Sequence, residues 1–166
     1  MKDDTVLVVD DDAPILKAIR RVLRREECRV LTASSADKGM ALLAQEDIQI
    51  VISDKNMPRT DGLVFLKQVK SEFPQVLTIM LTGNADLNSA VEAINAAGVF
   101  KYLVKPWDDD DLRFTVREAL AFVRRQHAGF SSRYDAKSND IVRRDLEKDF
   151  PGITHVVRDK DGYIIG

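Results

Sequence analysis

The sequence predicts an α/β fold, a doubly wound parallel sheet of five strands flanked by five helices. Through about the first 125 residues, short runs rich in Val, Ile and Leu alternate with longer stretches of helical spacing. Such apolar runs are typical of strands buried on both faces, and their alternation with helices is typical of a parallel sheet. With 166 residues, 45% of them hydrophobic, the chain can fill the core of one such domain plus an appendage.

The first two strands are each followed by a helix. The first strand is predicted at residues 5–9, and the next helix starts near Pro14, because proline suits the first helical turn. The second strand is predicted at residues 29–32. Ser34 or Ser35 can cap the second helix, since both hydroxyls stand just before a stretch of helical spacing.

The middle of the chain repeats this pattern. The third strand is predicted at residues 48–53 and the fourth at residues 76–81. The helix between them begins after Thr60-Asp61-Gly62, where Gly62 permits a tight entry, and must end before Pro74, because the residue before a proline avoids the helical conformation.

The last strand and two helices follow the same logic. The fourth helix is expected at about residues 87–97 and stops at Gly98, and the fifth strand covers residues 102–104. The fifth helix follows Trp107, and the carboxylates at 108–111 cap its start and favour its dipole. The helical residues expected to face the core are Ile15, Ile19, Val22, Leu23, Met40, Leu42, Leu43, Leu63, Leu66, Val69, Val91, Ile94, Ala97, Leu112, Val116, Leu120 and Val123.

The pattern changes at the end of the fifth helix. Residues 127–139 are polar and small and are expected to be a linker, and residues 140–166 a helix followed by a β-hairpin. The helix would carry Val142, Leu146 and Phe150 on one face. A segment this short cannot build its own core, so it is expected to dock on the main domain or on a second chain, which leaves a homodimer open.

Four of the predicted strands end in reactive polar residues. Asp10 and Asp11 follow the first strand, Asp54 the third, Thr82 the fourth and Lys105 the fifth. In open α/β sheets the ligand site lies beyond the carboxyl ends of the strands, where the strand order reverses. In the flavodoxin-like order 2-1-3-4-5, strands one and three are neighbours, so the three carboxylates would face one another.

Three crowded carboxylates repel unless a cation lies among them, and oxygen ligands favour Mg²⁺. A loop carbonyl, such as that of Asn56, could add a ligand. Asp54 would then attack a phosphoryl group in line, Lys105 would pair with that group, and Thr82 would donate a hydrogen bond to it.

The strand ends together are similar to the four signature regions of the receiver domain in two-component response regulators. The matching segments are Val-Val-Asp-Asp-Asp at 8–12, Ser-Asp-Lys-Asn-Met-Pro at 53–58, Leu-Thr-Gly at 81–83 and Tyr-Leu-Val-Lys-Pro at 102–106. The resemblance covers residues 1 to about 125, and the receiver domain is expected at residues 1–126. It implies a response regulator of a phosphorelay, a phosphoprotein with no cofactor besides Mg²⁺. Because the N-terminus does not resemble a leader and no apolar run approaches a membrane span, we expect the protein to be cytoplasmic.

The resemblance also assigns roles to single residues. It implies that Asp54 is the phosphoacceptor, that Asp11, Asp54 and the Asn56 carbonyl bind Mg²⁺ directly, and that Asp10 acts mainly through metal-bound water. Lys105 contacts the phosphoryl group. Thr82 and Tyr102 form a switch pair that changes the surface of helix four, strand five and helix five, and so controls binding to a partner protein.

The expected phosphodonor is a sensor histidine kinase or a phosphotransfer protein, and the downstream partner stays unidentified. Such a domain is not an enzyme beyond self-phosphorylation from small donors and autodephosphorylation. Two other functions stay open: a small aspartyl-phosphate phosphotransferase or phosphatase, and a DNA-binding regulator acting through the tail.

Composition adds several exclusions. The formal net charge is −2 and 31% of residues are charged, so no basic excess indicates a nucleic-acid surface. No apolar run approaches the length of a membrane span. Cys28 is the only cysteine, which excludes an intramolecular disulfide in this chain. We therefore expect neither nucleic acid nor membrane as a partner.

Overall fold

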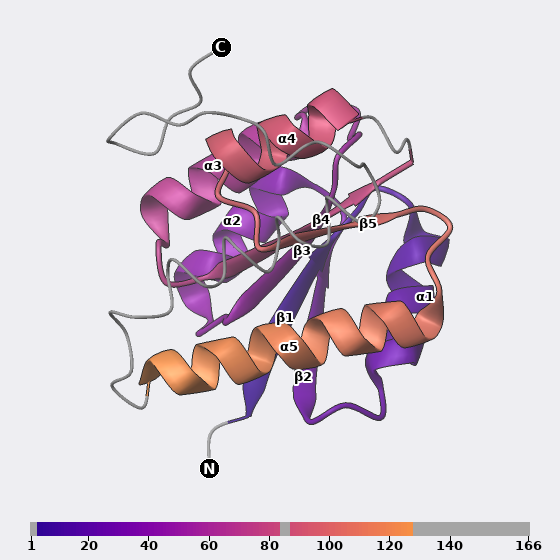
Figure 1. Cartoon of the computed structure of the whole chain (residues 1–166), viewed down its shortest axis with the longest axis vertical. Coiled ribbons are helices and arrows are strands. Elements are labelled where there is room, and N and C mark those ends of the chain that lie inside the picture. The colour runs from indigo at the N-terminus through magenta and orange to yellow at the C-terminus, as the bar shows by residue number, and fades with distance from the viewer. Residues whose placement is uncertain (1–2, 84–86, 128–166) are drawn as a thin grey trace.

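The computed structural model describes residues 3–83 and 87–127, which form one parallel sheet of five strands with five helices around it (Figure 1). The sheet order is β2-β1-β3-β4-β5, as predicted. The strands are β1 (Asp4–Val9), β2 (Cys28–Ala33), β3 (Ile50–Asp54), β4 (Leu77–Thr82) and β5 (Lys101–Val104). The helices are α1 (Ala13–Leu23), α2 (Ala36–Gln45), α3 (Gly62–Glu72), α4 (Leu87–Ala96) and α5 (Asp109–His127). The expected extension at 140–166 lies outside the described residues.

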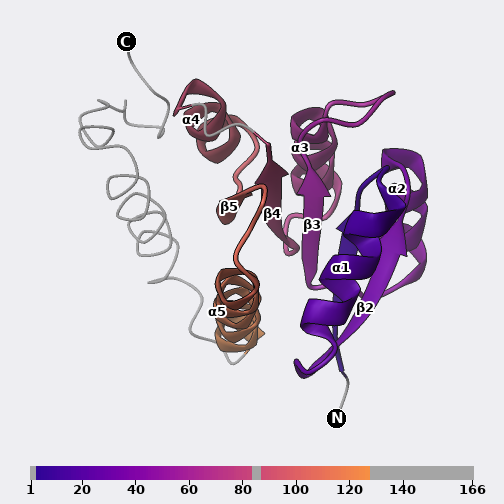
Figure 2. The ribbon, with the colours of Figure 1, turned by 90° about the vertical axis from the view of Figure 1, so that its right-hand side faces the viewer.

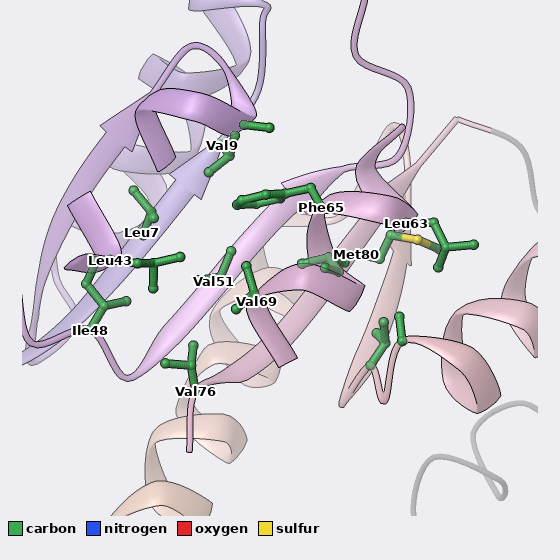
Figure 3. Close-up of a cluster of buried hydrophobic side chains, with 14 of the residues drawn as sticks. Leu7, Val9, Leu43, Ile48, Val51, Leu63, Phe65, Val69, Val76 and Met80 are labelled. Atoms are coloured by element: carbon green, nitrogen blue, oxygen red, sulfur yellow. The ribbon is translucent and has the colours of Figure 1, made fainter. Parts of the chain in front are cut away.

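The sheet separates two apolar layers. On one face, alternate strand residues pack against α2 and α3, around the fully buried Phe65 (Figure 3). On the other face, the intervening strand residues pack against α1 and α5 (Figure 2). Side chains alternate between the faces of a strand, so continuous Val and Ile runs supply both layers.

The helix ends follow the expected signals. Ser35, one of the two predicted serines, caps α2 and accepts a hydrogen bond from the Lys38 amide at 3.2 Å. Gly98 has a φ of 62°, the left-handed conformation in which glycine commonly ends a helix. Asp108 caps α5, since its carboxylate accepts from the Asp110 amide at 2.8 Å. The acidic run at 108–111 is thus a helix start, as predicted.

The third strand differs from its predicted bounds. It begins at Ile50 rather than at residue 48 and includes Asp54 as its last residue. The reason lies at Gln49, whose side-chain oxygen accepts a hydrogen bond from the Thr5 amide at 2.6 Å. The Gln49 amide also donates to the Thr5 carbonyl at 3.0 Å. Gln49 thus bonds to Thr5 through both its side chain and its backbone, directly before β3 begins.

The fourth strand is also shifted and includes Thr82. Backbone hydrogen bonds continue past the strand ends: the Lys55 amide donates to the Leu81 carbonyl at 2.8 Å, and the Lys105 amide to the Thr82 carbonyl at 2.7 Å. Asp54 and Thr82 thus belong to the rigid sheet rather than to the loops that follow it.

Helix α5 has 19 residues and ends at His127, one residue into the predicted linker. Its outer side is tied to the sheet and to the turn after α1 by ion pairs, Arg124 with Asp4 and Arg117 with Glu26, each at 2.7 Å. Within the described residues, no helix is both long enough and apolar enough to cross a membrane.

Candidate functional site

Three carboxylates meet at the carboxyl ends of β1 and β3. In the parallel pairing of these strands Val9 lies opposite Ser53, which brings the next residues, Asp10 and Asp54, beside each other. One carboxylate oxygen from each of Asp10, Asp11 and Asp54 lies within 4.8 Å of the others. Asp10 is fully buried, Asp54 is 6% exposed and Asp11 is exposed, so the cluster opens to solvent on the Asp11 side.

Lys105 reaches this cluster from the end of β5. Its ammonium nitrogen lies 3.1 Å from an Asp10 oxygen and 3.1 Å from an Asp54 oxygen. The other Asp10 oxygen accepts a hydrogen bond from the Asp12 amide at 2.9 Å. The Lys105–Pro106 peptide bond is cis. The structure therefore brings together all four charged residues predicted for the site.

Burial and pairing act in opposite directions on these groups. Burial raises the pKa of Asp10, and the Asp12 amide and Lys105 lower it only in part. Burial alone would lower the pKa of Lys105, but the hydrogen bonds to Asp10 and Asp54 and the attraction of their charges together outweigh burial and raise it. Lys105 is therefore protonated at neutral pH and compensates two buried carboxylates.

The loop after Asp54 folds back under its carbonyl group. A Cβ at Gly62 would lie 1.9 Å from the Asp54 carbonyl oxygen, so only glycine fits there. The Gly62 amide donates to the Lys55 carbonyl at 2.7 Å, and Asn56 forms an isolated bridge with Asp61. Gly62 therefore fixes the backbone that carries the acidic residue.

Gly62 was predicted only as a permissive helix start, so this close contact is new information from the structure. The Ser53 hydroxyl, which donates to the same Asp54 carbonyl at 3.0 Å, was not predicted at all. The sequence does carry one signal, a glycine directly at the start of the helix that follows the acidic strand end.

Thr82 and Tyr102 lie on the same face of neighbouring strands. Tyr102 pairs with Met80, and Thr82 is two residues beyond Met80 on β4. Because side chains alternate along a strand, residues two apart share a face. Thr82 is 3% exposed and Tyr102 is 8% exposed, so the hydroxyl and the ring are both buried.

The chemistry of the donor set suits a cation. The group of three carboxylates could hold a metal ion, and all of its ligand atoms are oxygens. The ammonium of Lys105 already lies between two of these carboxylates, which is the position of a counter-charge. The site thus combines a metal-binding cluster, a fixed cation and a nearly buried carboxylate.

Comparison with known proteins agrees with this geometry. Residues 6–117 match the family described as the response regulator receiver domain. The hydrogenase transcriptional regulatory protein HoxA of Cupriavidus necator is 42% identical over 119 residues, 72% of this chain and 24% of that protein. HoxA of Bradyrhizobium diazoefficiens is 33% identical over 161 residues, 91% of this chain and 33% of that protein. The chain thus spans about a quarter to a third of the length of these relatives.

A solved structure gives the same result for the fold. The signal receiver domain of an HD domain-containing protein from Pseudomonas fluorescens is 32% identical, with a TM-score of 0.71, and the alignment covers 74% of this chain and 98% of that one. The family match covers most of the described residues and includes the acidic cluster and Lys105. The chain therefore belongs to the response regulator receiver domains, the phosphoacceptor signalling modules of two-component systems.

Proposed function

We propose that Asp54 is the residue that accepts the phosphoryl group, from a sensor histidine kinase or a phosphotransfer protein. The observation that carries this assignment is the shared contact of Lys105 with Asp54 and Asp10, at 3.1 Å each. Asp54 is the member of the acidic cluster that ends a central strand, and its backbone is held by Ser53 and Gly62. A fixed carboxylate beside a fixed cation is prepared for in-line attack.

The transfer needs one bond to form and one to break. An Asp54 carboxylate oxygen bonds to phosphorus while the phosphorus–nitrogen bond of the donor phosphohistidine breaks, and the released imidazole takes up a proton. Lys105 stabilises the negative charge that gathers on the phosphoryl oxygens. The Thr82 hydroxyl, buried at the end of β4, would donate a hydrogen bond to one of these oxygens.

The proposed metal is Mg²⁺, because every ligand offered by the cluster is an oxygen. Asp11, Asp54 and the Asn56 carbonyl would hold it directly, with Asp10 acting through bound water. When bound, the ion neutralises charge between the carboxylates and the incoming phosphoryl group. Lys105 can serve the phosphoryl group only if the ion takes over part of the charge on Asp10.

We further propose that Thr82 and Tyr102 transmit the change to the α4-β5-α5 surface. Their shared face on β4 and β5 supports this pairing. The Tyr102 ring is already buried in this conformation, so the switch would be a shift of population between two packings rather than a long movement of the ring. Movement of Thr82 toward a phosphoryl oxygen would favour one of them.

The output is proposed to be protein binding by this surface. The relatives named above include transcriptional regulators and an HD domain-containing protein, and all share the receiver. We propose that this chain consists of a receiver at 1–126, a linker at 127–139 and a dependent extension at 140–166. A DNA-binding output through the tail is the second candidate, since the HoxA relatives are transcriptional regulatory proteins.

Beryllofluoride, a phosphoryl mimic, tests the acceptor assignment. With Mg²⁺ present, it should change the fluorescence of Trp107, the single tryptophan, in the wild type and not in Asp54→Asn. If Asp54→Asn showed the same fluorescence change as the wild type, Asp54 would not be the acceptor. Multiple turnover of a small phosphate ester such as p-nitrophenyl phosphate would instead support the phosphatase alternative.

A further inference from the structure

A cavity opens beside the acidic cluster, between the start of α2 and the loop that precedes α3. Its volume is about 310 Å³, which is within the range of small-molecule sites. Helices α2 and α3 are neighbours on one face of the sheet (Figure 2). We call this space the α2 cavity, and its wall includes the charged residues Asp11, Asp37, Lys38 and Arg59.

The α2 cavity lies beyond the acceptor rather than around it. Asp11 belongs both to the acidic cluster and to the cavity wall, so the two spaces adjoin. Every other wall residue stands in a loop that follows a strand or in the first turn of α2, whereas Asp54 ends β3 and is not in the wall. A donor attacked in line by Asp54 holds its leaving group on the far side of phosphorus. The cavity is therefore placed for a leaving group.

The wall offers two cations and an apolar patch. Within the described part of the chain, Arg59 forms neither an ion pair nor a side-chain hydrogen bond. The Lys38 ammonium donates to the Ser34 hydroxyl at 3.0 Å, and that hydroxyl can still donate its own hydrogen. Buried Ala36 and half-buried Met57 supply apolar surface. A carboxylate that carries a short alkyl group matches this combination.

We propose that the α2 cavity receives the leaving group of small acyl phosphates, the mixed anhydrides of a carboxylic acid and phosphoric acid. The inference rests on the proposed role of Asp54. An Asp54 oxygen bonds to phosphorus while the bond from phosphorus to the bridging oxygen breaks, and the electron pair of that bond leaves with the carboxylate. Negative charge on the bridging oxygen grows as the bond breaks. Lys38 and Arg59 therefore stabilise the transition state more than the bound donor.

Donors with a phosphorus–nitrogen bond would gain nothing from these two cations. Phosphoramidate releases ammonia and phosphohistidine releases imidazole, and both products are neutral once the nitrogen has taken up its proton. Neither leaves a negative charge for Lys38 and Arg59 to stabilise. The α2 cavity would thus make phosphorylation by acyl phosphates dependent on residues that phosphorylation by nitrogen-linked donors does not need.

One charge in the wall acts in the opposite direction. Asp37 is exposed in the first turn of α2 and has no ion pair with another described residue. Its carboxylate would repel a leaving carboxylate in the same cavity. Asp37→Asn should therefore speed the reaction with acyl phosphates, whereas removal of the cations should slow it. A purely structural role of these residues would not produce opposite signs.

The test measures phosphorylation of the full chain by acetyl phosphate and by phosphoramidate, each with Mg²⁺. Intact mass after acid quenching gives the rates for the wild type, Lys38→Gln/Arg59→Gln and Asp37→Asn. The control, Arg25→Gln/Lys67→Gln, removes the same two charges from exposed positions outside the cavity. Binding of beryllofluoride, which has no leaving group, checks that the acceptor site is intact in every variant.

We expect Lys38→Gln/Arg59→Gln to react about fivefold more slowly with acetyl phosphate and to stay within about twofold of the wild type with phosphoramidate, since each exposed cation contributes only a small factor. Asp37→Asn should react faster with acetyl phosphate alone. The control should keep both rates, and every variant should bind beryllofluoride as the wild type does.

Four results would overturn the inference while leaving the role of Asp54 standing. These are equal losses with both donors, an equal loss in the control, an unchanged rate of Lys38→Gln/Arg59→Gln with acetyl phosphate, and a slower reaction of Asp37→Asn with that donor. A wild type that reacts with neither donor would instead overturn the proposed role of Asp54, and this inference with it.

Discussion

At the scale of single residues, the contact between Gly62 and the Asp54 carbonyl shows how the fold fixes the acidic residue. A methyl group at Gly62 would overlap that carbonyl oxygen, because its carbon would lie only 1.9 Å from the oxygen. A side chain at position 62 would therefore displace backbone, and the nearest backbone atoms are those of Asp54. The position of Asp54 thus depends on a residue eight positions further along the chain.

Gly62→Ala is therefore expected to lower the free energy of unfolding by about 1–3 kcal/mol, the usual cost of overpacking. It should also slow phosphorylation of the folded protein. The matched control is Gly83→Ala, because a Cβ at Gly83 has nothing within 4 Å. Urea unfolding and a phosphorylation time course measure both effects. Equal stability and equal rates in the two variants would show that the contact does not matter.

Lys105 offers a second test at this scale. Lys105→Ala removes the cation shared by Asp10 and Asp54. With metal removed by EDTA, we expect a loss of about 1–3 kcal/mol at pH 7, less than for a fully buried pair because the lysine side chain is 20% exposed. Lys67→Ala, at an exposed position on α3, is the control.

The loss in Lys105→Ala should be smaller at lower pH. Burial raises the pKa of Asp10, so between its ordinary and raised pKa the folded state binds more protons than the unfolded state. The stability that Asp10 contributes is present at low pH and is lost as the pH rises through the pKa of Asp10 in the folded state. Without Lys105 that pKa rises further. A destabilisation that is greater at pH 5 than at pH 7 would contradict this account.

The charged members of the site could be predicted from the sequence because parallel strands end at one edge. Asp10, Asp11, Asp54 and Lys105 each follow or end a recognisable apolar run, and the strand order then brings them together. The support from Ser53 and Gly62 could not be predicted, because it depends on the path of the loop between β3 and α3.

At the scale of elements, α1 combines a well-packed inner face with an unfavourable outer one. Lys17 is in the middle of the helix, where the helix dipole stabilises a positive charge only weakly. It lies one turn before Arg20 and Arg21 on the same side of the helix. Lys17→Glu would replace two repulsions by two attractions of the favourable orientation, with the acid toward the N-terminus.

We therefore predict that Lys17→Glu raises the free energy of unfolding by about 0.5–1 kcal/mol. Thermal unfolding at low salt and at high salt measures it, and the gain should fall as salt rises. A variant that is less stable than the wild type would show that repulsion of Lys17 by Arg20 and Arg21 does not lower the stability of the protein.

The sequence predicted whether each element is a helix or a strand, but it predicted where the elements begin and end only in part. The helix caps at Ser35, Gly98 and Asp108 act through nearest neighbours in the chain, so local sequence is sufficient to find them. The start of β3 depends on Gln49, whose hydrogen bond joins it to Thr5, 44 residues away. A contact of that range is not visible in local pattern.

At the scale of the whole molecule, two apolar layers on one sheet hold the site in place, and residues 3–83 and 87–127 supply both. The net charge of −2 conceals the exposed basic residues on the outer face of α1, because charges elsewhere in the chain offset them. Composition could therefore argue against a basic excess while a local one-sign surface was present. Helical spacing separates the two faces of α1, whereas composition averages over both of them.

The proposed division of the chain leads to a prediction at the same scale. A protein ending at residue 127 should keep its fold and its Mg²⁺-dependent response to beryllofluoride, since every site residue precedes α5. Circular dichroism and Trp107 fluorescence would measure both. Loss of cooperative unfolding in this shortened chain would show that residues 128–166 belong to the core of the domain.

The most direct test of the central claim is the intact mass of the protein after exposure to acetyl phosphate and Mg²⁺, with rapid acid quenching, for the wild type and Asp54→Asn. The account predicts one added phosphoryl group on the wild type, none on Asp54→Asn, and none on the wild type when EDTA replaces Mg²⁺. An equal adduct on Asp54→Asn, or a wild-type adduct that forms without a divalent metal, would contradict it.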